Sequence, residues 1–336
     1  MLVIAGPTAC GKSALALALA EILDGEIVNA DSQQLYSDLP ILSAIPSEEE
    51  RQRVPHHLYG ILKGDAPCSA GAWRVRAQAC VEAIQRRKHS PILVGGTGLY
   101  LRAFLEGLRK VPPIPQQVRQ YTRTRFAALG RERFWQELCA MDPWATHHIR
   151  ATDPQRMQRA YEVFQATGRS LSSWGQDSPA PSAYVVKILP DRAPLYALCD
   201  QRFDSFLAKG ALDEVRGCLQ HTPPAVCDTM KTIGFQELRR VLEEGVALEE
   251  AVALVKQRTR QYAKRQVTWF RRQLSSPTLL PFLITSDTLP QVCADIVRSI
   301  GHHPSAQRLS LGADGDQAAQ GLVLAVHQRE GRTSAQ

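Results

Sequence analysis

The sequence predicts an α/β fold: a P-loop NTPase-like parallel sheet flanked by helices, with an inserted all-helical domain. Three observations support this. An apolar run at residues 2–5 leads into a glycine-rich loop and then into an Ala/Leu-rich helical segment that ends near Gly25. Two further apolar runs, at 26–30 and 91–94, end in Asp31-Ser32 and in the glycine-rich stretch 95–98. A long region after the third run lacks strand patterns and is bounded by proline clusters.

The first element is thus a strand, a loop and a helix, and the second and third runs are strands of the same sheet. In a parallel sheet the loops after the strands' carboxyl ends bind ligands, so the three exits should converge on one site. Between the second and third strands, residues 69–87 carry apolar side chains at helical spacing. This segment is the expected crossover helix of a βαβ unit.

The remaining elements set the predicted domain boundaries. Residues 1–111 form the first part of the core, and 112–182 form the helical insertion, which opens and closes at proline-rich breakers. Residues 184–189 return to the core as a strand within 183–300, followed by helical patterns at 194–220 and 234–274. Residues 301–336 are rich in Gly, Ser, Ala and Gln and are predicted to be a disordered tail.

Composition places the chain among ordinary globular proteins. Of 336 residues, 44% are hydrophobic and 22% charged, which excludes collagen-like, coiled-coil and wholly disordered chains. Eight cysteines are dispersed without a C-x-x-C pair, which favours a reducing cytoplasm. No apolar run reaches the roughly 18–20 residues of a membrane helix. The adjacent His56 and His57 do not share a helix face, so we interpret them as structural rather than as metal ligands.

The strongest single motif is a phosphate-binding loop. The pattern G-x-x-x-x-G-K-[ST] is matched over the eight residues Gly6, Pro7, Thr8, Ala9, Cys10, Gly11, Lys12 and Ser13. Backbone N–H groups of such a loop face one anion, the lysine adds charge, and the Ser13 hydroxyl could hold Mg²⁺. The motif indicates a phosphate or diphosphate without specifying a nucleoside triphosphate. Asp31 is the one good candidate for a magnesium-directed carboxylate, and it comes unusually early.

The net charge of +7 is concentrated in one segment. Residues 256–272 contain seven Lys or Arg and no acidic residue, interleaved with Tyr262, Trp269 and Phe270. Residues 115–170 add nine arginines and no lysine. Basic and aromatic side chains together suit RNA, although a solvated helix or an aromatic core face would look similar.

Seven segments in order resemble the tRNA dimethylallyltransferase family over about residues 1–275. They are GPTACGKS at 6–13, ADSQQLY at 30–36, HHL at 56–58, LVGGTGLYLRAFLEGL at 93–108, DPQRMQRAYEVFQATGRSL at 153–171, IGFQEL at 233–238 and TRQYAKRQVTWFRR at 259–272. The resemblance implies a magnesium-dependent enzyme that acts as a monomer. It would transfer a dimethylallyl group from dimethylallyl diphosphate to the exocyclic amine of the adenosine just 3′ of the anticodon, in tRNAs that read codons beginning with U.

The resemblance also implies roles for individual residues. Asp31 would accept the proton of the adenine amine, Thr97 would hold that amine, and Lys12 and Arg202 would stabilise the diphosphate leaving group. The tRNA anticodon stem-loop would contact two sets of residues. One set lies on the core: Asp31, Ser32, Gln33, Gln34, Thr97, Lys264, Arg265, Gln266, Trp269 and Arg271. The other lies on the insertion: Arg119, Gln155, Arg156, Met157, Gln158 and Arg159.

Bland alternatives remain for these residues. Asp31 could simply cap the helix that follows it, Thr97 could cap the next one, and Arg202 alone looks like a surface arginine. The family usually has a Gly-Thr-Ala-Lys-Pro stretch where this chain has residues 42–46, so Ile45 replaces a lysine. Three other activities stay open: prenylation of free adenine nucleotides, a P-loop kinase or NTPase, and a noncatalytic RNA-binding relic.

Overall fold

The structure is a computed structural model that describes residues 1–64, 66–177, 182–276 and 278–301. The chain divides into two compact units, Met1–Leu105 with Ala180–Gln336, and Glu106–Pro179. The insertion predicted over 112–182 overlaps the second unit over most of its length. The predicted tail lies outside the described residues, apart from Gly301, where the last helix ends.

The first unit contains a six-stranded parallel sheet with the order β3-β2-β4-β1-β5-β6. The predicted strands form β1 (Leu2–Ala5), β2 (Gly25–Asn29), β4 (Ser90–Gly95) and β5 (Tyr184–Ile188). The edge strands β3 (His56–His57) and β6 (Thr278–Leu280) were not predicted, because two or three residues are too few to show a periodic pattern. Because β3 precedes it, the strand predicted third, at 91–94, is the fourth along the chain.

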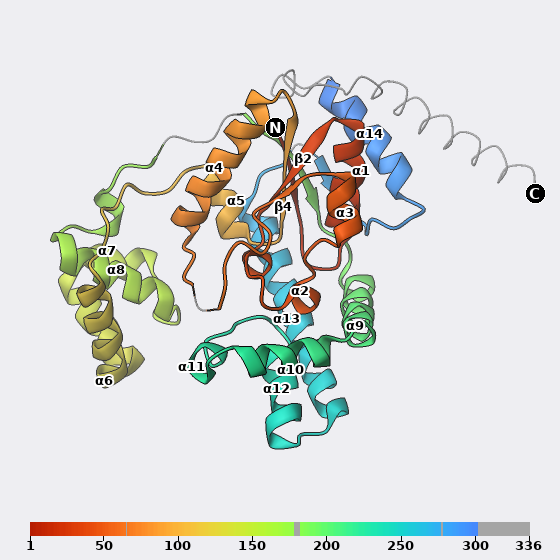
Figure 1. Ribbon diagram of the computed structural model, residues 1–336. Coiled ribbons are helices and arrows are strands. Elements are labelled where there is room, and N and C mark those ends of the chain that lie inside the picture. The colour runs from red at the N-terminus through yellow and green to blue at the C-terminus, as the bar shows by residue number, and fades with distance from the viewer. Residues whose placement is uncertain (65, 178–181, 277, 302–336) are drawn as a thin grey trace, which may run out of the picture. The chain divides into compact units, whose positions relative to one another are not determined.

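Helices cover both faces of the sheet, which explains why its central strands β1 and β4 are mostly apolar. The helices α1 (Lys12–Ile22) and α14 (Leu289–Gly301) pack on one face. The crossover helix α4 (Ala70–Arg86), at its predicted place, and α5 (Gly98–Leu105) pack on the other (Figure 1). Successive residues of β1 alternate between the two cores: Leu2 points to the first face and Val3 to the second.

A third core lies among helices of the same unit, around the buried Phe203 and Phe235. The two long helical patterns each resolve into two long helices separated at a glycine, as Figure 1 shows for the green-to-blue part of the chain. These are α9 (Arg192–Ala208) and α10 (Ala211–His221), then α12 (Phe235–Glu244) and α13 (Leu248–Gln273). Shorter elements complete the unit: η1 (Ser32–Leu35), α2 (Pro40–Ser43), α3 (Glu48–Arg53) and α11 (Pro224–Cys227).

The second unit is helical and has its own apolar core. It contains α6 (Gln116–Met141), kinked at Gly130, α7 (Pro143–His148), α8 (Pro154–Thr167) and the short η2 (Leu171–Ser173). Phe134, Leu138 and Met157 are fully buried in it. At its ends, Arg109 bridges Gln176 in antiparallel fashion, so the entering and leaving segments run side by side.

The adjacent histidines lie on β3, and His57 belongs to a polar cluster around the buried carboxylate of Glu26. Its Nε2 is 2.6 Å from Oε2 of Glu26, which also accepts from Arg87 Nη2 at 2.7 Å. Burial raises the pKa of Glu26, but the hydrogen bonds from Arg87 and His57 outweigh it and the net shift is downward. Within the described residues no three or more His, Cys, Asp or Glu side chains are grouped so that they could hold a metal ion, and no helix there is both long and apolar enough to cross a bilayer.

Candidate active site

The phosphate loop connects β1 to α1 at the carboxyl end of the sheet. Gly11 caps α1 with a φ of 88°, a conformation that residues with a Cβ rarely adopt. Lys12 donates from Nζ to the Pro7 carbonyl oxygen at 2.6 Å, which folds its side chain back over the loop. Ser13 is exposed, and the first turn of α1 contains no acidic residue. The loop thus offers a cation, a hydroxyl and a helix N-terminus to an anion.

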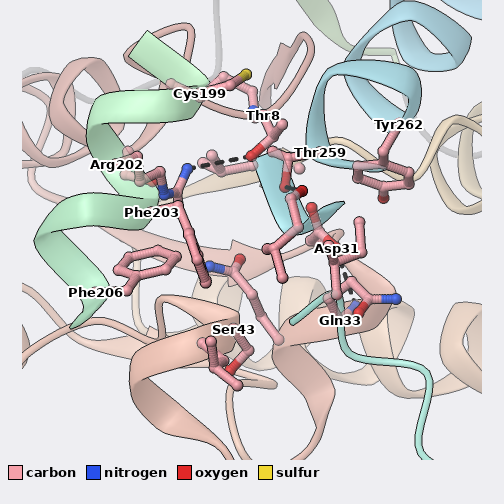
Figure 2. Close-up of a pocket in the computed structure, with 18 residues that line it drawn as sticks. Thr8, Asp31, Gln33, Ser43, Cys199, Arg202, Phe203, Phe206, Thr259 and Tyr262 are labelled. Atoms are coloured by element: carbon pink, nitrogen blue, oxygen red, sulfur yellow. Dashed lines mark hydrogen bonds between the residues drawn. The ribbon is translucent and has the colours of Figure 1, made fainter. Parts of the chain in front are cut away.

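Arg202, predicted from the resemblance alone, reaches this loop from α9. Its Nη1 donates to Thr8 Oγ1 at 3.2 Å, and its guanidinium carbon lies 5.3 Å from the ring centroid of Phe206 (Figure 2). Burial lowers the pKa of Arg202, and the negative charge of Asp31 opposes this shift. An arginine pKa starts so high that the group keeps its charge, so Arg202 adds a partly buried cation beside Lys12.

Asp31 follows β2 directly, and its two carboxylate oxygens are used differently. Oδ1 accepts from the Gln33 N–H at 3.0 Å and so caps η1. In the described part of the chain no hydrogen bond is made by Oδ2. The side chain of Asn29 fixes the Asp31 backbone by accepting from its N–H at 2.7 Å and donating to its carbonyl oxygen at 3.0 Å. Capping and proton acceptance are therefore compatible roles for one side chain.

Thr97 ties the loop after β4 to the loop after β2. Its Oγ1 accepts from the Ser32 N–H at 2.9 Å and donates to Ser32 Oγ at 3.1 Å. Its own N–H donates to the Ala30 carbonyl oxygen at 3.2 Å. Gln34 donates from Nε2 to the Ala44 carbonyl oxygen at 2.6 Å, while the buried Oε1 of Gln33 has no hydrogen-bond partner in the structure.

Two cavities share Lys12, Ser13 and Arg202 as lining residues. The smaller, about 90 Å³, is lined by Asp31 and Gln33 together with Thr259 and Tyr262 of α13 (Figure 2). The larger, about 630 Å³, runs along the phosphate loop. Its wall contains Ile45, the residue that stands in place of the family lysine, and also Lys209, a third cation.

Tyr262 and Thr259 were not among the predicted site residues. The hydroxyl of Tyr262 lies near Thr97, and burial, followed by the charge of Asp31, raises the pKa of Tyr262. The phenol therefore stays protonated at neutral pH. The sequence left open whether the aromatics of this segment face RNA or the core. The structure separates them: Phe270 is fully buried in the core, whereas Tyr262 faces the cavity.

The basic segment of α13 is less uniform than its sequence. In its first half each cation is paired with a carboxylate from another helix. Lys256 lies 2.7 Å from Asp204, Arg260 lies 2.7 Å from Asp200, and Arg258 pairs with Glu237. In its second half the described residues provide no ion pair, and the exposed cations are Lys264, Arg265, Arg271 and Arg272.

The other predicted tRNA-binding residues differ in exposure. Gln266 is buried, with 5% of its surface exposed, and Trp269 packs against Gly98. In the second unit Arg119, Gln155 and Arg156 are exposed, and Gln158 and Arg159 are half-buried, whereas Met157 belongs to the core. Three arginines there pair with carboxylates of their own unit: Arg125 with Glu137, Arg156 with Asp153 and Arg159 with Glu162.

The parallel sheet and the loop between β1 and α1 define an α/β fold of the P-loop type. The family model described as IPP transferase matches residues 34–273. The chain belongs to this family, that of the tRNA dimethylallyltransferases, which confirms the family and the fold class predicted from the sequence.

Individual relatives support the same membership. The chain is 49% identical to the tRNA dimethylallyltransferase of Parvibaculum lavamentivorans over 81% of its own length and 87% of that protein. It is 45% identical to the enzyme of Nitrobacter hamburgensis, with the same coverage. A eukaryotic dimethylallyltransferase acting on tRNA matches with a TM-score of 0.78 and 26% identity, over 96% of this chain and 84% of that one. The tRNA isopentenylpyrophosphate transferase of Bacillus halodurans matches with a TM-score of 0.62 and 28% identity, over 90% of this chain and 99% of that one.

Proposed function

We propose that this chain transfers a dimethylallyl group from dimethylallyl diphosphate to the N6 amine of the adenosine just 3′ of the tRNA anticodon, which is nucleotide 37 of the tRNA. Asp31 is the base and diphosphate is the leaving group. The observation that carries this is one arrangement in the first unit. The phosphate loop and Arg202 share a cavity wall with Asp31 and Tyr262. A diphosphate and an adenine amine can therefore meet there.

The diphosphate side of the reaction is served by positive charge. Lys12 and Arg202 flank the loop, and they stabilise the charge that develops on the leaving oxygen as the bond between C1 of the donor and that oxygen breaks. The larger cavity offers Lys209 as a further cation at its wall. The loop would position the diphosphate and stabilise its charge as it leaves. The reaction therefore uses a phosphate-binding loop without transferring a phosphoryl group.

The acceptor side is served by the loops after β2 and β4. An adenine amine is a poor nucleophile, and its proton must leave as the N6–C1 bond forms. Oδ2 of Asp31 accepts that proton, while Thr97, held by two hydrogen bonds with Ser32, orients the amine. The adenosine must leave its stack to reach this cavity, as bases do in other enzymes that modify them within a nucleic acid.

The Ser13 hydroxyl and the Asp31 carboxylate both line the smaller cavity, and they are oxygen donors of the kind that Mg²⁺ prefers. These residues fit a magnesium ion, with Ser13 as its protein ligand at the loop. When bound, Mg²⁺ would offset negative charge on the diphosphate. The residues of this chain would still hold the donor and remove the proton.

The exposed second half of the basic segment and the arginine-rich second unit would bind the tRNA. Lys264, Arg265 and Arg271 have no carboxylate partner in the described residues, so their charge is available for phosphates. Arg119 and Arg156 are exposed on the second unit. Both sets of cations would contact the phosphates of the RNA backbone, and such contacts do not depend on the base sequence.

The test is incubation with labelled dimethylallyl diphosphate and an unmodified tRNA transcript. We expect label in the tRNA, none when guanosine replaces the target adenosine, and a loss of transfer when EDTA removes Mg²⁺. Other outcomes would identify the alternatives. Label on free adenine nucleotides alone indicates a nucleotide prenyltransferase, ATP turnover without transfer indicates a kinase or NTPase, and tRNA binding without either indicates a relic.

A further inference from the structure

Gln266 is the one predicted tRNA-binding residue of α13 that lies buried, and both ends of its amide are occupied. Oε1 accepts from the Thr8 N–H at 2.8 Å, and Nε2 donates to the Gly96 carbonyl oxygen at 2.9 Å. Thr8 belongs to the phosphate loop and Gly96 to the loop that carries Thr97. The side chain therefore connects the diphosphate side of the site directly to the adenine side.

The fit around this amide is close. A Cβ at Gly96 would lie 2.3 Å from Nε2 of Gln266, so a glycine is needed for the amide to reach the carbonyl oxygen. One turn earlier on the same helix, Tyr262 reaches Thr97, and one turn later Trp269 covers Gly98. Residues 262, 266 and 269 recur at helical spacing, so one stripe of α13 contacts the whole segment 96–98.

Thr8 is held from two sides. Its N–H is donated to Gln266, so this N–H is committed inside the protein rather than offered to phosphate. Its hydroxyl accepts from Arg202. Arg202 belongs to α9 and Gln266 to α13. Together they fix the position of the phosphate loop relative to these two helices.

We propose that Gln266 is a positioning residue, which sets the phosphate loop at a fixed distance from the Thr97 loop, and that it is not a tRNA contact. This inference rests on the proposed transfer reaction. Lys264 and Arg271 point elsewhere on the helix and are exposed, so tRNA can bind α13 without touching the amide. Removing the amide leaves the part-buried Thr8 N–H and the buried Gly96 carbonyl oxygen unpaired, and both loops would shift to satisfy them.

The first test replaces Gln266 by methionine, which is similar in length but makes neither hydrogen bond. We expect the KM for dimethylallyl diphosphate to rise and kcat to fall, each by roughly tenfold, the scale of one or two lost hydrogen bonds in a site whose geometry matters. The Kd for tRNA should stay within about twofold of wild type. Gln261→Met, at an exposed position of the same helix, is the matched control and should leave the donor kinetics unchanged. Lys264→Ala should raise the Kd for tRNA and leave the KM for dimethylallyl diphosphate unchanged.

Gly96→Ala is a second variant that breaks the same link from the other loop. Because its Cβ would also lie 3.2 Å from Oδ2 of Asp31, the KM for dimethylallyl diphosphate is compared rather than kcat, and it should rise as in Gln266→Met with normal tRNA binding. Weakened tRNA binding with unchanged donor kinetics in Gln266→Met would overturn the proposal. So would a variant in which both the donor kinetics and the Kd for tRNA are unchanged. A lowered Tm with loss of both ligands would assign Gln266 a general packing role and would also overturn it. If the wild-type enzyme transfers no label, the proposed function fails instead, so the two failures are distinguishable.

Discussion

In the proposed reaction the single side chain of Asp31 combines a structural and a chemical task. Oδ1 caps η1 through the Gln33 N–H, and Oδ2 is left for the substrate. Asparagine keeps an oxygen that can cap but cannot accept the amine proton. Alanine removes both functions. The two substitutions therefore separate the base from the cap.

We expect Asp31→Asn to lower transfer by about 100-fold or more, the contribution of a general base, with unchanged tRNA affinity and Tm. Asp31→Ala should lose the same activity and in addition about 1 kcal/mol of unfolding free energy, the value of a helix cap. Single-turnover transfer and thermal unfolding measure the two effects. Near-normal transfer by Asp31→Asn would remove this carboxylate from the mechanism.

Individual residues differ in how far the sequence could identify them. The phosphate loop has a local motif, and Asp31 stands at a strand end beside it, so both were predicted from the residues themselves. Arg202 lies in an ordinary helix, and only resemblance pointed to it. Thr259 and Tyr262 face the cavity because of how α13 packs against α9 and α5, and Gln266 is buried for the same reason. Tertiary packing decides these roles, and no local pattern records it.

At the scale of elements, α13 shows why a charge count along the sequence is incomplete. Its seven cations have no acidic neighbour within the segment, yet helices α9 and α12 bring Asp200, Asp204 and Glu237 to the first half. Strand prediction is limited in the same way, because contacts with other parts of the fold leave no local pattern. The long apolar runs of the central strands were recognisable, whereas β3 and β6 are specified by pairing at the sheet edges rather than by a pattern of their own.

The two halves of α13 should therefore respond differently to neutralisation. Lys264→Gln with Arg271→Gln should weaken tRNA binding and reduce the slope of log K against log salt by about two, because two phosphate contacts are lost. Lys256→Gln with Arg260→Gln should leave the slope unchanged. It should cost at most about 1 kcal/mol of unfolding free energy, since these pairs are partly exposed. Binding titrations at several salt concentrations decide the matter, and equal slopes for the two double variants would refute the division.

At the scale of the whole molecule, the chain is one unit interrupted by another. The apolar clusters around the sheet and around Phe235 contain residues of the first unit, and the cluster around Phe134 contains residues of the second. The segments that enter and leave the second unit are paired: Lys110 N–H donates to the Gly175 carbonyl oxygen and Asp177 N–H to that of Leu108, at 2.8 and 2.7 Å. Its two ends are thus held together by its own hydrogen bonds.

This organisation predicts that the second unit can be removed without unfolding the first. We expect a chain in which Glu106–Pro179 is replaced by a short Gly/Ser linker to keep a cooperative unfolding transition. It should also bind inorganic diphosphate as the full chain does, because all the cavity-lining residues belong to the first unit. Its affinity for tRNA should fall by roughly tenfold or more, since the exposed arginines of the insertion are lost. Calorimetric titration with diphosphate and with tRNA gives both values, and the isolated second unit, which has its own core, serves as the control. Undiminished tRNA affinity would show that the arginines of the insertion are solvated surface, and a loss of diphosphate binding would show that the site depends on the insertion.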